Sequence, residues 1–457
     1  MTGVQTCALP ISAGTGNNNS LKTQTDLTNA GKWTIALNGN NQASIKTIDS
    51  NVNRHTIMYN SSSNIFSCYA SGQQAVCLFI RSEEYDHTES ETIATIFSFD
   101  KHIVESGVAL TVSGTATCNN ANQLILEDGG QFVHHNAGVM ATMKKGVNAY
   151  SGNDGWYTIS SPFISYAPAG TMTGDDYDLY AYNEGGTLEW ENHKQGNGFS
   201  MVSGQGYLYA HNPTTTLRMT GTLNNGNVEQ TVQLGYANTV NPIRGFNLLG
   251  NPTAHDISFE KTESVSDGYY YLNNNEDWVY TTTATVPVGY GFLVKANAEN
   301  QTVTLNPQNN RGESLVEDQY LCVSIGEENA YVKLNEGVSM PLLSMKGQHS
   351  SLYFLGEGKP FVMLVRDGAN DLDLCFEPRC DGTQTLMVDV QNLSLDYLHL
   401  VDKLTGADVD LLSPSLTPLN AEHLRVERNN PGQPAIYTFT AKTTDDTSRF
   451  RLVFKAQ

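Results

Sequence analysis

The chain has 457 residues, with 26 Lys and Arg against 47 Asp and Glu, so its formal net charge is −21. Such an acidic balance argues against binding to nucleic acid or insertion into an anionic membrane. Charged residues make up only 16% of the chain while its mean hydropathy is −0.34. The polarity therefore comes from Asn, Thr, Ser, Gly and Gln, a composition typical of turn-rich β structure. No apolar run reaches the roughly 20 residues that span a bilayer.

The first eleven residues, MTGVQTCALPI, resemble the translation of a sequencing adapter. They lack the basic segment and the longer apolar core of a signal peptide. We therefore expect residues 1–11 to be an artefact and the chain to be a fragment of a longer protein.

Residues 12–81 contain short alternating runs such as Trp33–Leu37, separated by Asn, Ser and Gly clusters. A period of two predicts antiparallel strands, here the C-terminal remnant of a truncated β-domain. Residues 82–150 begin as an acidic linker and continue as short strands followed by glycine. This pattern is typical of a small β-solenoid or of one edge of a sandwich. The adjacent His134 and His135 would point to opposite faces of a strand, so one metal ion cannot easily bind both.

The clearest pattern is an internal repeat in residues 151–311, where three segments recur in the same order at nearly constant spacing. The pairs are Gly155–Pro162 with Gly245–Pro252, Asp178–Asn183 and Trp190 with Gly268–Asn273 and Trp278, and Gly204–Asn212 with Gly289–Asn297. We expect two copies of one all-β unit, at about 155–222 and 245–308, which share a core because each is short.

Residues 312–457 contain further short strand-like runs, whose spacing predicts a C-terminal β-sandwich. The expected fold class is therefore all-β. It comprises several β-sandwich-like modules in tandem, an internally duplicated central unit and a short β-solenoid segment.

Several segments resemble the large, multi-domain surface proteins of gut Bacteroidales, and the resemblance covers most of residues 33 to 457. The segments are Tyr59–Gly72, Leu126–Gln131, Asn136–Val139, Gly155–Pro162, Gly250–Pro252, Leu398–Leu411 and Ser448–Phe454. The resemblance implies an extracellular or outer-membrane surface location. In that group the last segment commonly precedes a sorting domain read by the type IX secretion machinery. Since the chain stops at Gln457, we expect it to be cut at both ends or anchored otherwise.

No motif indicates an enzyme: Gly-x-Ser-x-Gly, His-Glu-x-x-His, a phosphate loop and a dinucleotide fingerprint are all missing from the sequence. We expect no cofactor, with calcium as the exception to consider. Two acidic clusters offer the oxygen ligands that calcium prefers, although neither matches an EF-hand and solvated turn carboxylates are the alternative. Their members are Asp175, Asp176 and Asp178, and Asp367, Asp371 and Asp373.

Two cysteine pairs are candidates for disulfides in an exported protein. Cys68 and Cys77 lie symmetrically about Gly72-Gln73 and would face each other across a hairpin, with two buried thiols as the alternative. Cys375 and Cys380 flank a small loop, and a disulfide is favoured there over zinc because a second ligand pair is missing.

The repeat region is rich in aromatic residues, which can stack on sugar rings when they are exposed. The candidates for glycan binding are Trp190, Trp278, Tyr270 and Tyr207. Filling of the core is the alternative reading. In the run Tyr269–Tyr271, alternation across a strand predicts that at least one ring is exposed.

Together these features predict a non-catalytic extracellular surface protein with an adhesive, ligand-presenting or spacer role. The alternatives are an accessory β-region of a secreted peptidase or glycan-degrading enzyme whose catalytic domain lies upstream, or a glycan-binding module proper. The expected partner is a glycan or a host or cell-surface protein.

Overall fold

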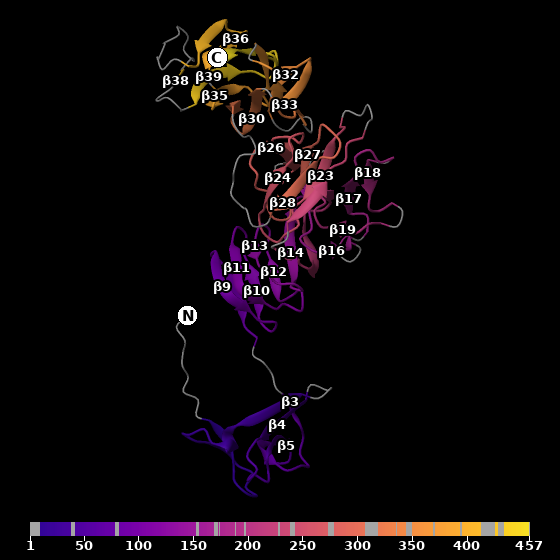
Figure 1. The fold of residues 1–457 in the computed structure, drawn as a ribbon, viewed down its shortest axis with the longest axis vertical. Coiled ribbons are helices and arrows are strands. Elements are labelled where there is room, and N and C mark those ends of the chain that lie inside the picture. Colours follow the sequence, from indigo (N-terminus) through magenta and orange to yellow (C-terminus); the bar gives the residue numbers. More distant parts are fainter. Residues whose placement is uncertain are drawn as a thin grey trace. The chain divides into compact units, whose positions relative to one another are not determined.

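The structure is a computed structural model, and it confirms the all-β fold class (Figure 1). It describes residues 10–37, 42–77, 82–151, 155–168, 172, 174–187, 189–195, 198–226, 229–237, 243–272, 278–306, 319–334, 336–343, 350–368, 371–393, 395–412, 426–427 and 434–456. Of the segment expected to be an artefact, residues 1–9 lie outside this description. Contacts along the chain define two compact units, Met1–Ser82 and Glu83–Gln457.

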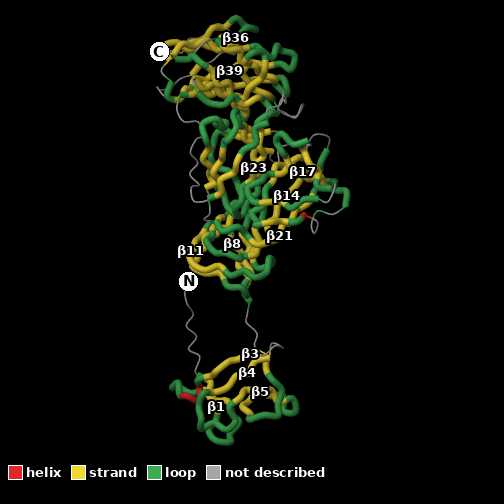
Figure 2. Tube along the Cα trace, turned by 45° about the vertical axis from the view of Figure 1, so that its right-hand side comes forward, coloured by secondary structure: helices red, strands yellow, loops and turns green. Residues whose placement is uncertain are grey.

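Strands and loops account for almost all of the described chain (Figure 2). The helix η1 (Asn29–Gly31) is a single 3-10 turn. Among the described residues, no helix has the length and apolar character that crossing a bilayer requires.

The unit Met1–Ser82 is built on one antiparallel sheet in the order β3-β4-β5-β6, with β7 paired to β4, and a separate β1-β2 hairpin. Its strands are β1 (Ile11–Ala13), β2 (Leu21–Thr23), β3 (Trp33–Leu37), β4 (Gln42–Thr47), β5 (Thr56–Asn60), β6 (Ile65–Tyr69) and β7 (Val76–Cys77). A small core of its own forms around buried Cys68 and half-buried Trp33 and Ile57.

The predicted pairing of Cys68 with Cys77 is wrong, because their strands are not partners. β6, which carries Cys68, pairs with β5, whereas β7, which carries Cys77, pairs with β4. Both cysteines are free thiols; Cys68 is buried and Cys77 is exposed. Burial raises the pKa of the Cys68 thiol to about 11, so this sulfur is unreactive at neutral pH.

Glu83–Gln457 begins with a short parallel β-solenoid of about three turns. One parallel sheet contains β8 (Glu84–His87), β10 (Lys101–Val104), β12 (Leu124–Leu126) and β14 (Met140–Val147), and the other contains β9 (Glu91–Ile96), β11 (Ala109–Ala116) and β13 (Gln131–Val133). Glycines make the corners possible. Gly129 has φ +80°, and a Cβ on Gly130 would lie 2.6 Å from the carbonyl oxygen of Val104. Of the two predicted alternatives, the solenoid is the one that forms.

The two copies of the repeat fold into four-stranded sheets with the same strand order. Copy 1 has β15 (Trp156–Ile159), β20 (Tyr207–His211), β17 (Tyr177–Tyr182) and β18 (Trp190–Asn192), and copy 2 has β23 (Phe246–Gly250), β27 (Gly291–Lys295), β25 (Tyr269–Leu272) and β26 (Trp278–Thr281). The register agrees as well, since Tyr182 lies opposite Trp190 in copy 1 and Leu272 lies opposite Trp278 in copy 2.

The smaller strands show where the copies differ. They are β16 (Ser165–Tyr166), β19 (Met201–Val202) and β21 (Thr215–Thr222) in copy 1, and β22 (Gln230–Gln233), β24 (Ser258–Lys261) and β28 (Thr302–Asn306) around copy 2. β21 pairs along its whole length with β14, the last strand of the solenoid sheet, whereas β28 pairs with β22 and β24. Copy 1 therefore shares its core with the solenoid, and copy 2 has a core of its own. The copies do not share a single core, contrary to the sequence prediction.

The C-terminal module, residues 320–456, is one hydrogen-bonded sheet of twelve strands around a single apolar core. The strands are β29 (Tyr320–Ile325), β30 (Glu328–Leu334), β31 (Met340–Pro341), β32 (Ser351–Gly356), β33 (Lys359–Arg366), β34 (Leu372–Glu377), β35 (Gly382–Gln391), β36 (Leu395–Asp402), β37 (Ala407–Asp410), β38 (Val426–Glu427), β39 (Ala435–Ala441) and β40 (Phe450–Ala456).

A buried ion pair holds the end of this module together. The side chains of Arg449 and Asp402 are 5% and 1% exposed. The guanidinium donates to both carboxylate oxygens of Asp402, at 3.0 and 2.7 Å, and to Asp445 at 3.0 Å. The hydroxyl of Tyr437 also donates to Asp402, at 3.1 Å. Removing one partner from such a satisfied pair leaves an uncompensated buried charge.

We expect Arg449→Met to lower the free energy of unfolding of the C-terminal module by about 3–5 kcal/mol. Arg451→Met is the matched control, because the Arg451–Asp373 pair is exposed and such pairs contribute about 1 kcal/mol or less. Hydrogen exchange of the β36 and β40 amides in increasing urea measures the free energy of unfolding of both variants. Equal losses in the two variants would contradict a structural role for the buried pair.

The same pair predicts a pH dependence. Burial alone would raise the pKa of Asp402, but the hydrogen bonds and charge of Arg449 outweigh burial and hold that pKa below its usual value. A carboxylate with a lowered folded-state pKa stabilises the fold above its unfolded pKa of about 4, and this stabilisation is lost as pH falls through the folded pKa. The stability gap between the wild type and Arg449→Met should therefore narrow from pH 7 to pH 3. A constant gap in the same exchange experiment would count against this assignment.

Candidate functional site: the outer faces of the duplicated sheets

Each four-stranded sheet has an inner face toward its own core and an outer face on the opposite side. The register matches the two outer faces position by position. The equivalent pairs are Trp156 and Phe246, Thr158 and Leu248, Tyr180 and Tyr270, Leu208 and Leu293, and Ala210 and Lys295. One fold therefore presents the same surface twice, with different side chains.

The outer face of copy 2 is covered by the C-terminal module. Phe246, Tyr270 and Leu293 are 1%, 1% and 5% exposed. They form one apolar cluster with residues of the C-terminal module, namely Tyr331, Met340, Val362 and Met363. The hydroxyl of Tyr270 donates to the carbonyl oxygen of Pro341 at 2.9 Å. This seam is a packed interior and leaves no ring face of Tyr270 for a ligand.

The outer face of copy 1 is only partly covered: Thr158 and Tyr182 are buried against copy 2, whereas the side chain of Asp178 is 41% exposed. Its inner end is closed by copy 2, since the hydroxyl of Thr158 accepts a hydrogen bond from the backbone N–H of Leu272 at 2.9 Å. Beyond that point Trp156 and Tyr180 are only half-buried, with ring centroids 6.0 Å apart. Tyr150, 38% exposed, packs edge-on against Trp156 at 5.5 Å. We call Tyr150, Trp156 and Tyr180 the aromatic row.

Polar groups lie beside the aromatic row on the same face. Asp178 lies opposite Ala210, which in turn lies opposite Trp156. The carboxylate of Asp178 accepts a hydrogen bond from Asn192 at 3.3 Å and forms an ion pair with Lys194 at 3.1 Å. The face thus combines flat rings with hydrogen-bonding groups, the combination that binds sugars.

Of the residues predicted to bind glycan, Trp190 lies on the outer face of copy 1 opposite Tyr182, and the other three lie elsewhere. Tyr207 is 1% exposed and belongs to the core of copy 1, and Tyr270 belongs to the seam. Trp190 and Trp278 are half-buried at equivalent positions against that seam cluster. The predicted exposure within Tyr269–Tyr271 is wrong: Tyr269 is buried, Tyr270 is buried and Tyr271 is half-buried, because both faces of this sheet are covered.

The acidic clusters predicted for calcium do not converge. Within the described ranges no three His, Cys, Asp or Glu side chains come together as a metal site requires. Asp178 pairs with Lys194, and Asp373 pairs with Lys403 and Arg451. The remaining members, Asp175, Asp176, Asp367 and Asp371, are exposed. These carboxylates are either neutralised by basic residues of nearby strands or solvated, which corrects the prediction.

The second predicted disulfide is also wrong. Cys375 lies inside β34 and is buried, whereas Cys380 lies in the exposed loop after that strand, and both are free thiols. Burial raises the pKa of Cys375 to about 11. His134 is buried too, and burial lowers its pKa to about 4, so it is neutral at physiological pH.

Comparison with protein-family models, with curated proteins and with solved structures finds no match for this chain. The site therefore has to be identified from its own geometry. Trp156, Tyr180 and Tyr150 were missed as site residues in the sequence. The signal that could have revealed Trp156 is the alignment of the two repeat copies. At this position copy 1 has Trp, whose indole N–H can hydrogen-bond, and copy 2 has Phe246.

The contrast between the covered and the open face can be tested at one equivalent position. We expect Tyr270→Ala to destabilise Glu83–Gln457 by about 3–5 kcal/mol, since it leaves a cavity in the seam. Tyr180→Ala should cost about 1 kcal/mol or less, because this half-exposed ring lacks a covering module. Differential scanning calorimetry of the two variants measures the difference. Similar destabilisation would mean that copy 1 is covered as copy 2 is.

Proposed function

We propose that this chain is a non-catalytic, adhesive region of an extracellular surface protein, and that the aromatic row of copy 1 is its saccharide-contact surface. The observation that carries the proposal is the pair of outer faces. The same positions form a packed interior in copy 2 and a half-exposed row of rings in copy 1. The resemblance to surface proteins supports the extracellular location.

The polar groups of the open face favour a saccharide over an apolar protein partner. A protein module that covered copy 1 as the C-terminal module covers copy 2 would have to remove water from the Asp178 carboxylate, whose side chain is 41% exposed. Desolvating a carboxylate is costly unless new hydrogen bonds replace the water. Sugar hydroxyls supply such bonds while the C–H face of the ring stacks on Trp156 or Tyr180.

Affinity electrophoresis of the full chain in gels containing neutral polysaccharides tests this proposal. The probes are xylan, mixed-linkage β-glucan and galactomannan, each compared with a gel lacking polysaccharide. We expect at least one to retard the wild type, and we expect Trp156→Ala to weaken that binding at least tenfold, or about 1.4 kcal/mol. The indole is the largest ring of the aromatic row, so its loss removes most of the stacking area.

The matched control is Tyr397→Ala, because Tyr397 of the C-terminal module is 38% exposed, as Tyr150 is. This variant should migrate like the wild type in every gel, whereas Tyr150→Ala should bind more weakly. If none of the three polysaccharides retards the wild type, the proposal that this chain binds saccharides is wrong. Retardation of Trp156→Ala equal to that of the wild type would sink the assignment to this face.

A further inference from the structure

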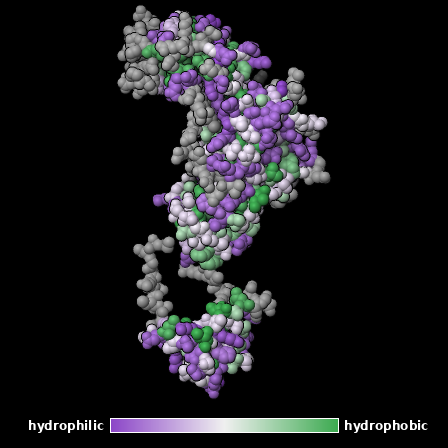
Figure 3. Space-filling view, viewed as in Figure 1, coloured by the Kyte–Doolittle hydropathy of each residue, from purple (hydrophilic) through white to green (hydrophobic). Residues whose placement is uncertain are grey.

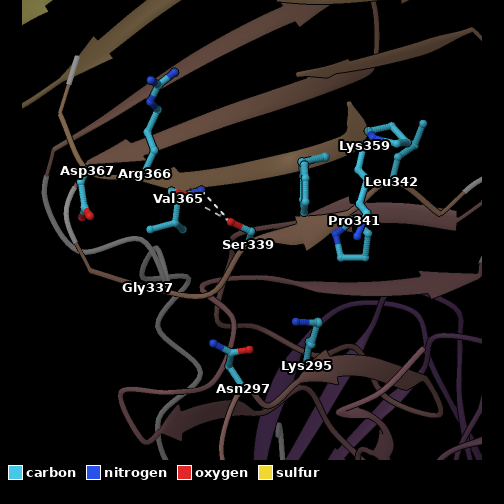
Figure 4. Close-up of a pocket in the computed structure, with 12 residues that line it drawn as sticks. Lys295, Asn297, Gly337, Ser339, Pro341, Leu342, Lys359, Val365, Arg366 and Asp367 are labelled. Carbon is cyan, nitrogen blue, oxygen red and sulfur yellow. Dashed lines mark hydrogen bonds between the residues drawn. The ribbon is translucent and has the colours of Figure 1, made fainter. Parts of the chain in front are cut away.

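A cavity of about 620 Å³ opens where the outer face of copy 2 emerges from beneath the C-terminal module. Ligand sites for small molecules typically occupy about 300–1,000 Å³. Lys295 and Asn297 enter from copy 2 on one side, and Ser339 and Pro341 of the C-terminal module lie on the other (Figure 4). Lys295 is the copy 2 equivalent of Ala210, at the end of the outer face.

The cavity is positively charged although the chain as a whole is strongly negative. Three basic residues line it, Lys295, Lys359 and Arg366, and among its described lining residues Asp367 is the one carboxylate. On the face of Glu83–Gln457 drawn in Figure 3, hydrophilic residues cover more of the surface than hydrophobic ones. A basic patch in a chain of net charge −21 has many carboxylates available as partners.

Two of the basic residues of the cavity nevertheless form no ion pair with a described carboxylate. Within the described part of Glu83–Gln457, most half-buried basic side chains form an ion pair, including Lys144, Lys261 and Lys333. Lys295 and Arg366 are half-buried and form none, and the Nε atom of Arg366 is buried without a hydrogen-bond partner. In Figure 4 the guanidinium of Arg366 is turned away from Lys295. Lys359, the third basic lining residue, is exposed, so Lys295 is the half-buried cation available at the cavity.

A second cation, Arg244, makes the positive charge of the half-buried Lys295 less favourable. Burial and the charge of Arg244 both lower the pKa of Lys295. Arg244 stacks on the ring of Tyr236 at 4.0 Å, and its buried Nε atom also lacks a hydrogen-bond partner. An anion in the cavity at Lys295 Nζ would compensate the lysine charge and offset its repulsion by Arg244.

We propose that this cavity binds a sugar carrying an anionic group, a carboxylate or a sulfate ester, with the anion at Lys295 Nζ. Asn297 supplies an amide for hydroxyl groups, and Pro341 supplies an apolar surface. The rest of the chain repels long polyanions, so the ligand is a single acidic sugar at the end of a glycan. That the ligand is a sugar rests on the proposed function; the anion site rests on the unpaired lysine alone.

Isothermal titration of the full chain with methyl glucuronide, glucose 6-sulfate and methyl glucoside tests this inference. We expect one or both anionic sugars to bind at least tenfold more tightly than the neutral one at low salt, and the tighter of the two identifies the anion. Lys295→Met should abolish that preference and Lys295→Arg should restore it. Lys442→Met, an exposed and unpaired lysine of the C-terminal module, is the control and should behave like the wild type.

The outcomes separate this site from the aromatic row. If Trp156→Ala leaves neutral polysaccharide binding unchanged while Lys295→Met removes the preference for anionic sugars, the cavity assignment stands and the proposed function fails. The cavity assignment is overturned if Lys295→Met prefers anionic sugars as strongly as the wild type does. It is also overturned if the wild type binds all three sugars equally. A lowered melting temperature would reveal a folding defect in Lys295→Met. In that case the anion site is tested with Lys295→Gln, which should lose the preference for anionic sugars, and with the wild type, whose glucuronide binding should weaken as salt is added.

Discussion

Each duplicated sheet carries large apolar side chains on both faces, and this constraint explains how Glu83–Gln457 is assembled. One core can cover only one face of a sheet, so the second face needs another module or must tolerate water. In copy 2 the C-terminal module covers the second face around Tyr270. In copy 1 the inner face and β21 are used to complete the solenoid, and the outer face contacts copy 2 through Thr158, Tyr182 and Trp190. The open aromatic row follows from this distribution of neighbours.

Buried charges along the seam are compensated at Asp267 but not at the neighbouring Lys295. Asp267 of copy 2, 5% exposed, lies between Lys261 at 2.7 Å and Lys333 of the C-terminal module at 2.6 Å. The buried carboxylate is compensated from both sides of the seam, which is the condition under which buried charge is tolerated. Among the described residues Lys295 has no such partner, although its backbone N–H donates to the hydroxyl of Ser266, next to Asp267. The contrast makes the cavity a site that an external anion can complete.

The periodicity of the sequence predicts strands well, and the repeat predicts the shared strand order of the two copies, because both depend on local pattern. Exposure could not be predicted in the same way. Alternation in Tyr269–Tyr271 distinguishes two faces, but whether each face is covered depends on Met340 and Met363, far along the chain. The cysteines show the same limit. Symmetry about Gly72 suggests a hairpin, whereas β7 pairs with β4, a choice made by tertiary packing.

The side chains of the two outer faces have diverged in the direction that their surroundings require. Trp156 and Thr158 of copy 1 correspond to Phe246 and Leu248 of copy 2, so two side chains that can hydrogen-bond stand in copy 1 where copy 2 has purely apolar ones. An indole N–H left in water costs nothing, whereas buried in the seam it would need a partner. The remaining pair, Ala210 and Lys295, differs in charge instead. At this position copy 1 has a small buried side chain and copy 2 places a cation in a cavity, so one duplicated fold provides two chemically distinct surfaces.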